Sequence, residues 1–304
     1  MRIVAEHLSY VYNAGSPFAS RALKDVSLTI EEGEFFGIIG HTGSGKSTFV
    51  QHLNALLRVP SSLKKYKKKK PKKGETPSPK TVLTVGEFDL TDKKTDFRAL
   101  RSKVGMVFQY PEAQLFAETV KEDVAFGFKN FSKEKPKPEE IEFAVKSALE
   151  IVGLDYEEIK DQSPFDLSGG QKRRVAIAGV IVTRPEVLVL DEPAAGLDPL
   201  GKQEIMELLH KLHREWCKTV VIVSHDMDEI SENCTCAAVF SEGEIRYVLP
   251  PSELFAHTEE LLALGLDVPL TAKLCAALKQ RGVVLSCDFT TEDFIRSVLA
   301  LKNS

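Results

Sequence analysis

The stretch "GHTGSGKST", residues 40–48, decides the fold of this chain. It fits the pattern G-x-x-x-x-G-K-[ST], and its glycines let successive backbone N–H groups curve around phosphate oxygens. A helix that follows adds the partial positive charge of its N-terminus. We therefore predict a phosphate-binding loop whose lysine reaches the β- and γ-phosphates and whose serine binds Mg²⁺. The predicted loop comprises Gly40, His41, Thr42, Gly43, Ser44, Gly45, Lys46, Ser47 and Thr48.

Short apolar runs on both sides of this loop in the chain predict the sheet that carries it. Each ends at a glycine or a polar residue: "FFGIIG" (35–40), "VGMVFQ" (104–109), "VLVLDE" (187–192) and "VVIVSH" (220–225). Such runs are typical of parallel strands covered on both faces, although a buried helix has the same pattern. Ligands of open α/β sheets bind at the carboxyl ends of their strands. A helix is expected after the first run, from an apolar stripe at Phe49, Leu53, Leu56 and Leu57.

Composition bounds the remaining possibilities. The chain has 304 residues, of which 43% are hydrophobic and 28% charged, enough for one large domain or one large and one small. It contains no run near the roughly 20 apolar residues of a membrane-spanning helix, and its start lacks the features of a secretory signal. Any membrane role is therefore expected to come from a partner. The five cysteines include one close pair, Cys234 and Cys236, but no zinc-binding spacing, so we expect buried or inactive thiols in a reducing cytosol.

A basic insert interrupts an otherwise acidic chain. Residues 64–80 hold nine lysines and one acid, a local charge of +8. Because the net charge of the whole chain is −4, the remaining residues together carry −12. The segment 61–80 is of low complexity and is expected to be a solvated, mobile insert before a possible strand, "TVLTVGEFDL" (81–90). Anionic lipid and nucleic acid are the alternative ligands that its charge allows.

Helical patterns occupy the middle and the end of the chain. Residues 115–160 are amphipathic around "EEIEFAVKSALEIVGL", with Gly153 as a C-terminal stop. After Pro250 the pattern changes to short helices, the last of which begins with Thr290 and Asp293 at capping-box spacing. We expect a small helical domain there.

Two further motifs carry chemistry. Asp191 ends an apolar run, where a carboxylate can hold a metal through water, and Glu192 could polarise an attacking water. The stretch "LSGGQKRR" (167–174) places a serine and two glycines at the start of an expected helix, where N–H groups and a hydroxyl can face phosphate oxygens. Taken alone, Ser-Gly-Gly could equally be a turn or a helix cap.

With the phosphate loop and LSGGQ in this order, the sequence resembles the ATP-binding cassette (ABC) family, whose signature motif is LSGGQ. The resemblance implies an α/β cassette over residues 1–249, with a mainly parallel core sheet, an antiparallel β part and a helical subdomain at about 110–180. Residues 250–304 would form a small, mainly helical C-terminal domain. It also implies that two cassettes associate head to tail, so that the signature of one closes over the γ-phosphate held by the other.

The same resemblance assigns roles one residue at a time. Glu192, His225 and Gln109 would be catalytic, His225 as the switch histidine and Gln109 as the Q-loop glutamine. The metal would be held by Ser47, Gln109 and Asp191. Tyr12 would stack on adenine, with Tyr10 as the alternative. Besides Tyr12 and the phosphate loop, the nucleotide would contact Ser168, Gly169, Gly170, Gln171 and the D-loop residue Asp198. Ala194, where many relatives have a hydroxyl residue, and the lysine insert depart from the family pattern.

The segment "YPEAQLFAETVKEDVAFG" (110–127) resembles the ATPases of energy-coupling factor (ECF) transporters, in particular one of their two paralogous ATPases. This resemblance implies an ATPase that powers an importer of vitamins or other micronutrients, including metal ions. Its partners would be a second ATPase, identical or paralogous, and a transmembrane subunit that contacts residues 109–116. A substrate-binding membrane subunit would be engaged indirectly, with the chain peripheral on the cytoplasmic face of the cell membrane. Other kinds of ABC transporter are further alternatives. A soluble ABC ATPase acting on nucleic acid or in translation is the alternative of another class, but this chain lacks the second cassette or long coiled coil of such proteins.

Overall fold

The predicted parallel sheet forms the centre of the molecule. A computed structural model describes residues 1–60, 79–132, 134–285 and 287–302. The strands of the sheet lie in the order β10-β9-β3-β8-β7-β6, and all pair in parallel except β10, which runs antiparallel to β9. They are β3 (Phe35–Ile39), β6 (Val104–Val107), β7 (Val187–Asp191), β8 (Thr219–Val223), β9 (Cys236–Ser241) and β10 (Glu244–Leu249). The four apolar runs are therefore strands, as predicted, and the α/β fold class is confirmed.

Strand β3 shows why these runs are continuously apolar. All five of its residues are buried, because successive side chains point to opposite faces and both faces are covered. Phe35 and Ile39 belong to the hydrophobic core on the side of the helical layer. Phe36 and Ile38 belong to the core on the other side, which they share with Phe49 of the following helix.

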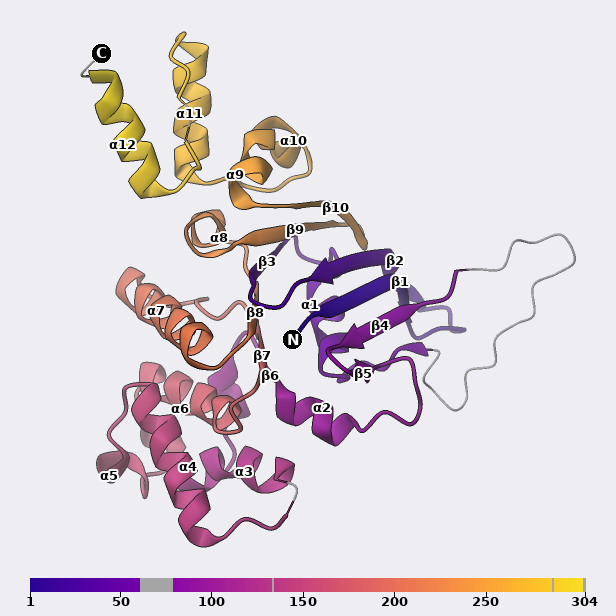
Figure 1. Ribbon diagram of the computed structural model, residues 1–304, viewed down its shortest axis with the longest axis vertical. Coiled ribbons are helices and arrows are strands. Elements are labelled where there is room, and N and C mark those ends of the chain that lie inside the picture. Colours follow the sequence, from indigo (N-terminus) through magenta and orange to yellow (C-terminus); the bar gives the residue numbers. More distant parts are fainter. Residues whose placement is uncertain (61–78, 133, 286, 303–304) are drawn as a thin grey trace, which may run out of the picture.

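A second, antiparallel sheet covers one side of this core (Figure 1). Its order is β2-β1-β4-β5, formed by β1 (Ile3–Tyr12), β2 (Ser20–Ile30), β4 (Val82–Val85) and β5 (Phe88–Asp89). The segment 81–90, predicted as one strand, is instead a hairpin in which Val85 pairs with Phe88. Gly86, with φ of 54°, makes the turn that breaks the strand.

Helix α1 (Lys46–Leu53) follows β3 and the phosphate loop, as predicted, but it is shorter than its apolar stripe indicated. Phe49 and Leu53 are buried, whereas Leu56 is 50% exposed and lies beyond the helix. Ala55, with φ of 55°, turns the chain out of the helical conformation. The prediction that Leu56 packs on the sheet is therefore wrong.

Helices fill the middle of the sequence and gather at one end of the molecule (Figure 1). They are α3 (Val120–Phe131), α4 (Pro138–Ile151), α5 (Tyr156–Ile159) and α6 (Gly169–Ile181), with the short turns η2 (Pro111–Gln114) and η3 (Pro164–Asp166) beside them. Helix α4 stops where expected, because Gly153 adopts φ of 76° just after it. Helix α2 (Phe97–Lys103) leads into β6.

Further helices lie between the last strands of the sheet and after them, at the end of the chain. They comprise α7 (Pro199–Glu215), α8 (Met227–Asn233), α9 (Pro251–Leu254), η4 (Phe255–His257), α10 (Thr258–Ala263), α11 (Leu270–Gln280) and α12 (Thr291–Lys302). Leu254, Phe255 and Leu261 are buried in the same core as Phe35, whereas α11 and α12 project from the body (Figure 1). The proposed division at residue 250 therefore separates segments that share a core.

Two smaller expectations concern the ends of segments. Thr290 caps α12, since its Oγ1 accepts a hydrogen bond from the N–H of Asp293 at 3.3 Å. The reciprocal half of the predicted capping box is replaced, because the carboxylate of Asp293 accepts from Asp288 and not from Thr290. Most of the lysine insert, residues 61–78, lies outside the described residues. Within the described ranges, no helix is both long and apolar enough to cross a bilayer.

Candidate active site

The phosphate loop connects β3 to α1, and its shape depends on glycine. Gly40 has φ of 152° and Gly45 has φ of 107°, a region that side chains disfavour. A Cβ atom at Gly40 would lie 2.3 Å from the carbonyl oxygen of Phe240, and one at Gly45 would lie 2.6 Å from that of Ala22. The loop is therefore packed against two neighbouring strands, and only glycine fits at these two positions.

Lys46 already points into this loop. Its Nζ donates hydrogen bonds to the carbonyl oxygens of Gly40, at 2.6 Å, and His41, at 3.0 Å. Burial lowers the pKa of Lys46, while the nearby carboxylates of Glu192 and Asp191 oppose that change. A cation held in a partly desolvated loop suits an incoming phosphate, which can replace the carbonyl groups as its partner.

The carboxyl ends of β7, β6 and β8 bring the predicted catalytic residues together. Glu192 accepts a hydrogen bond from Gln109 Nε2 on Oε2, at 2.6 Å, and its Oε1 lies 3.1 Å from His225 Nδ1. Asp191 lies beside the phosphate loop, where burial raises the pKa of its carboxyl group and a hydrogen bond with Ser47 opposes the rise. The structure thus assembles two adjacent groups: one carboxylate with its two partners, and one carboxylate with a hydroxyl.

The backbone at Glu192 is strained and held in place. Its φ of 51° is unusual for a residue with a side chain. Its N–H donates to the carbonyl oxygen of Val223 at 2.8 Å, and its own carbonyl accepts from the guanidinium of Arg173 at 3.3 Å. Arg173 also donates to the carbonyl of Ala195, at 2.8 Å. Sequence reasoning missed Arg173, because a basic residue after the signature gives no sign of where its side chain lies.

Tyr12 and Tyr10 lie beside the end of the loop and helix α1. The hydroxyl of Tyr12 lies 3.2 Å from Oγ1 of Thr48, the last residue of the loop. The ring of Tyr10 makes edge contacts with Tyr12, at 4.9 Å between centroids, and with His52 of α1, at 4.8 Å. The ring of Tyr10 therefore packs against other rings on two sides. Tyr12 as the residue that stacks on adenine stays a prediction.

The signature residues lie elsewhere. Ser168 caps α6, accepting from the N–H of Gln171 at 3.3 Å, while the side chain of Gln171 accepts from the N–H of Ser168 at 3.0 Å. Ser168, Gly169 and Gly170 are exposed, and a Cβ on either glycine would meet no atom within 4 Å. Helix α6 belongs to the helical layer, away from α1 (Figure 1). Asp198 of the D-loop caps α7 by accepting from the N–H of Gly201 at 2.8 Å.

An aromatic patch follows Gln109. Tyr110, Phe116 and Phe126 are each more than half exposed, and the rings of Phe116 and Phe126 are in edge contact at 4.9 Å between centroids. The carboxylate of Asp123 fixes this segment by accepting from the N–H groups of Phe116 and Ala117, at 2.8 and 2.9 Å. We name the contacting pair Phe116 and Phe126 the aromatic patch. Phe126 is on α3, and only the fold brings its ring into contact with that of Phe116.

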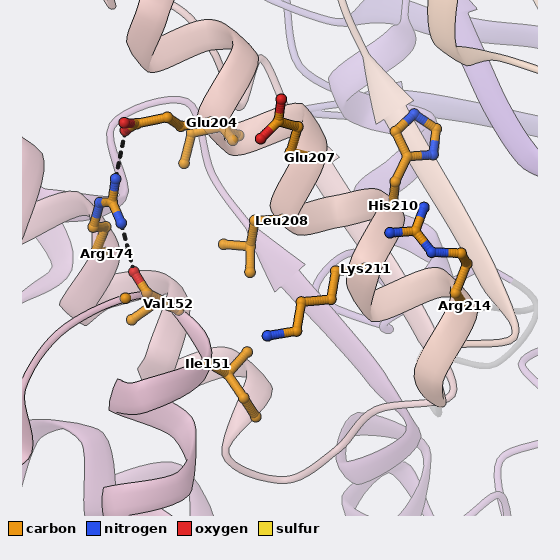
Figure 2. A pocket seen from close by; sticks show the side chains of 11 residues that line it. Ile151, Val152, Arg174, Glu204, Glu207, Leu208, His210, Lys211 and Arg214 are labelled. Carbon is orange, nitrogen blue, oxygen red and sulfur yellow. Dashed lines mark hydrogen bonds and ion pairs between the residues drawn. The ribbon is translucent and has the colours of Figure 1, made fainter.

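A cavity of about 600 Å³ lies apart from these residues, between α4, α6 and α7 (Figure 2). Arg174 spans its wall, donating to the carbonyl of Val152 at 2.7 Å and to the carboxylate of Glu204 at 2.5 Å. Neither the phosphate loop nor Glu192 lines it. The catalytic groups are therefore no part of this cavity.

Comparisons with known proteins identify the arrangement. A family model described as "ABC transporter" matches residues 23–195, which include the phosphate loop, the signature and Glu192. An energy-coupling factor transporter ATP-binding protein EcfA2 of Clostridioides difficile is 46% identical, over 96% of this chain and 94% of the relative. That of Symbiobacterium thermophilum is 49% identical, over 99% of this chain and 97% of the relative.

Solved structures agree with the sequence relatives. The structure of cbiO1 from Clostridium perfringens, described as part of the ABC transporter complex cbiONQ, superposes with a TM-score of 0.68 at 35% identity, over 90% of this chain and 97% of that one. The ATP-binding cassette MJ0796, described as a dimer in a post-hydrolysis state with ADP and Pi, gives 0.67 at 28% identity, over 82% of this chain and 98% of that one. The chain belongs to the ABC transporter family and, within it, to the ATP-binding proteins of energy-coupling factor transporters.

Proposed function

We propose that this chain is the ATP-hydrolysing subunit of an ECF-type importer of vitamins or other micronutrients, metal ions included. One observation carries the proposal. The chain holds two glycine-lined helix N-termini, at α1 and α6: in the first, Gly40 and Gly45 are packed against neighbouring strands, and in the second, Ser168, Gly169 and Gly170 are all exposed. A single chain therefore supplies half of each of two nucleotide sites, and a second ATPase, identical or paralogous, supplies the other halves.

The residues of the loop fit ATP and Mg²⁺. The N–H groups of residues 40–48 and Lys46 would hold the phosphates, and Tyr12 would stack on adenine. The hydroxyl of Ser47 and the carboxylate of Asp191, with Gln109 beside them, are the oxygen donors that Mg²⁺ prefers. When bound, the metal would neutralise charge on the phosphates.

Glu192 is the residue that we assign to water activation. Its two carboxylate oxygens are each contacted by one neighbour, Gln109 or His225, which fixes the plane of the group. An ionised carboxylate in this position can accept a proton from an attacking water. His225, 69% exposed, can turn from Glu192 toward a γ-phosphate and donate to it.

The dimer described for MJ0796 supports pairing of this chain, as does the exposure of its signature residues. Partly exposed apolar residues on the last helices provide a second contact surface for a partner ATPase. They are Leu270 and Leu274 of α11 and Ile295, Val298 and Leu299 of α12. A small C-terminal domain used in pairing, over residues 250–304, is part of this proposal.

A membrane partner would bind at the aromatic patch and the segment 109–116. Exposed aromatic rings fixed on a rigid turn are typical anchors of protein interfaces. We assign this surface to the transmembrane subunit, through which the substrate-binding membrane subunit is engaged. The chain would then be peripheral, on the cytoplasmic face of the cell membrane. The relatives named above are transporter proteins, so the nucleic-acid alternative finds no support in them.

The variant Ser168→Arg tests the shared site. We expect the isolated chain to bind ATP with unchanged affinity, because its own loop is intact, while hydrolysis by the assembled complex falls more than about tenfold. Thr29→Arg, at an exposed hydroxyl residue of β2 outside the site and the C-terminal segment, is the control and should retain hydrolysis. If Ser168→Arg weakens ATP binding to the isolated chain as strongly as it lowers hydrolysis, the signature acts within its own chain and the proposal fails.

The variants Phe116→Ser and Phe126→Ser test the membrane contact. We expect each to weaken co-purification with the transmembrane subunit and to lower uptake, with ATP affinity of the isolated chain unchanged. Phe143→Ser, 70% exposed on α4, is the matched control for the loss of an exposed ring. Normal assembly and uptake in both patch variants would remove the aromatic patch from the interface.

A further inference from the structure

Two cysteines that belong to none of the sequence motifs described above are in contact in the C-terminal segment. Cys275 lies on α11 and Cys287 in the loop that leads to α12, and their sulfur atoms are 3.3 Å apart. Both residues are half-buried. Within the described ranges this is the one hydrogen-bonded contact between thiols, and it does not involve the sequence neighbours Cys234 and Cys236.

The loop that carries Cys287 is held against two helices. The carbonyl oxygen of Phe289 accepts hydrogen bonds from the hydroxyls of Thr271 on α11, at 2.5 Å, and Ser231 on α8, at 2.9 Å. Thr271 and Ser231 are both buried. Cys287 is therefore kept beside Cys275 by contacts that do not depend on either thiol, and the effective concentration of one thiol for the other is high.

Burial limits the reactivity of Cys275. Burial, together with the hydrogen bond to Cys287, raises the pKa of Cys275 to about 12. A thiolate, not a thiol, attacks a disulfide, so Cys275 is a poor first nucleophile at neutral pH. Cys275 is better suited to the second step, in which the sulfur atom it attacks is held beside it and proximity offsets its small thiolate fraction.

We propose that Cys275 and Cys287 are an oxidation-sensitive dithiol that closes to a disulfide when a small-molecule disulfide such as oxidised glutathione is available. Cys287 attacks one sulfur of glutathione disulfide, and one glutathione leaves as a thiol while a mixed disulfide forms. Cys275 then attacks the sulfur of Cys287 and releases the second glutathione. The two protein thiols lose two electrons and two protons, and one glutathione disulfide becomes two glutathiones.

Closure would join α11 covalently to the loop before α12. The bond would fix the base of α12, whose residues Ile295, Val298 and Leu299 are partly exposed. A segment that we assign to pairing would thus be stiffened by oxidation. The dithiol itself rests on the sulfur contact alone and stands whether or not that assignment holds.

Equilibration with glutathione tests the proposal on the full chain. The protein is held at a series of ratios of reduced to oxidised glutathione, quenched with iodoacetamide, unfolded and alkylated, and digested with trypsin. We expect two of the five thiols to escape alkylation and a linked pair of peptides, residues 274–279 and 282–296, to form. Breaking this link should require at least about tenfold more reduced glutathione in the native chain than in urea, because folding holds the sulfurs together.

Matched variants separate the steps. Cys275→Ser and Cys287→Ser should each form no linked peptides, and oxidation of the remaining thiol should stop at a mixed disulfide with glutathione. Cys236→Ser, which removes a cysteine outside the pair, should form the linked peptides like the parent chain. The proposal is overturned if no linked peptides form at any glutathione ratio, or if they form equally readily in urea.

Discussion

The phosphate loop and the signature segment have the same chemistry and opposite surroundings. Each presents backbone N–H groups and a hydroxyl at the start of a helix, α1 in one case and α6 in the other. In the loop, Ser44, Lys46 and Thr48 are buried, whereas Ser168 and both signature glycines are exposed. The loop is thus packed within its own chain, whereas the signature is an exposed surface.

The glycines make this difference quantitative. A side chain at Gly40 or Gly45 would collide with a neighbouring strand, so the fold itself requires glycine there. A side chain at Gly169 or Gly170, the first two residues of α6, would meet no atom of this chain within 4 Å, so the fold does not require glycine there. Packing within this chain therefore does not require glycine at these two positions, in agreement with the proposal that a second ATPase closes over α6.

The largest expected effect is on ATP hydrolysis, at Glu192 near the phosphate loop. Glu192→Gln should lower ATP turnover of the assembled complex by about 10²- to 10⁴-fold, because an amide can still accept a hydrogen bond but cannot take a proton from water. ATP binding should be retained, since the phosphate loop is unchanged. Steady-state hydrolysis and equilibrium nucleotide binding measure the two quantities. Near-normal turnover would remove Glu192 from water activation.

Alanine in place of one glycine in each segment is expected to change stability in opposite directions. Gly45→Ala should lower the free energy of unfolding by about 2–4 kcal/mol, because of its backbone conformation and its contact with Ala22. Gly170→Ala should raise it by up to about 1 kcal/mol, and yet lower hydrolysis by the complex. Urea unfolding of the isolated chain gives both values. A destabilised Gly170→Ala chain would contradict the comparison.

The tyrosines give a smaller effect on nucleotide affinity. Tyr12→Ala should weaken ATP binding by about 1–3 kcal/mol, the usual contribution of a base stacked on an aromatic ring. Tyr12→Phe should retain most of this, because only the contact with Thr48 is lost. Tyr10→Ala serves as the comparison at the neighbouring ring. A larger loss of affinity in Tyr10→Ala than in Tyr12→Ala would reverse the assignment.

The smallest effect is a pH dependence beneath the phosphate loop. His52 of α1 is fully buried, its Nδ1 donates to the carbonyl of Thr48 at 2.7 Å, and its Nε2 has no partner among the described residues. Burial lowers the pKa of His52, and the hydrogen bond to Thr48 only partly opposes this. The unfolded chain therefore takes up the proton first, and the folded chain loses stability as the pH falls below about 6.5.

Removing His52 should remove that loss. We expect His52→Gln to show a weaker decrease in the free energy of unfolding between pH 7.5 and 5.5 than the parent chain, by at most about 1.4 kcal/mol for each pH unit. His7→Gln, at a partly exposed histidine of β1, is the control. An unchanged pH profile in His52→Gln would show that His52 is not the titrating group.

Local patterns predicted the sheet well and the tertiary contacts poorly. The apolar run at 187–192 could be recognised as a strand because both of its faces are buried, and the glycines of the phosphate loop because their spacing is fixed by the phosphates. The hairpin at Gly86 and the early end of α1 were missed, since single residues with positive φ ended elements whose apolar pattern continued. The meeting of Gln109, Glu192 and His225 was expected from family resemblance, because no local property of sequence brings three strand ends together.

Arg173 has a consequence for how a pair of these chains would work. Arg173 is on the signature helix α6, and its buried guanidinium donates hydrogen bonds to the carbonyl groups of Glu192 and Ala195. It also interacts electrostatically with Glu112 in η2. The helix offered to a neighbour is thus tied to the catalytic loop of its own protomer. ATP binding at one of the two shared sites should therefore change the affinity of the other, and hydrolysis at the two sites would be cooperative. The dependence of hydrolysis on ATP concentration, compared between the parent and Arg173→Gln, would reveal that communication.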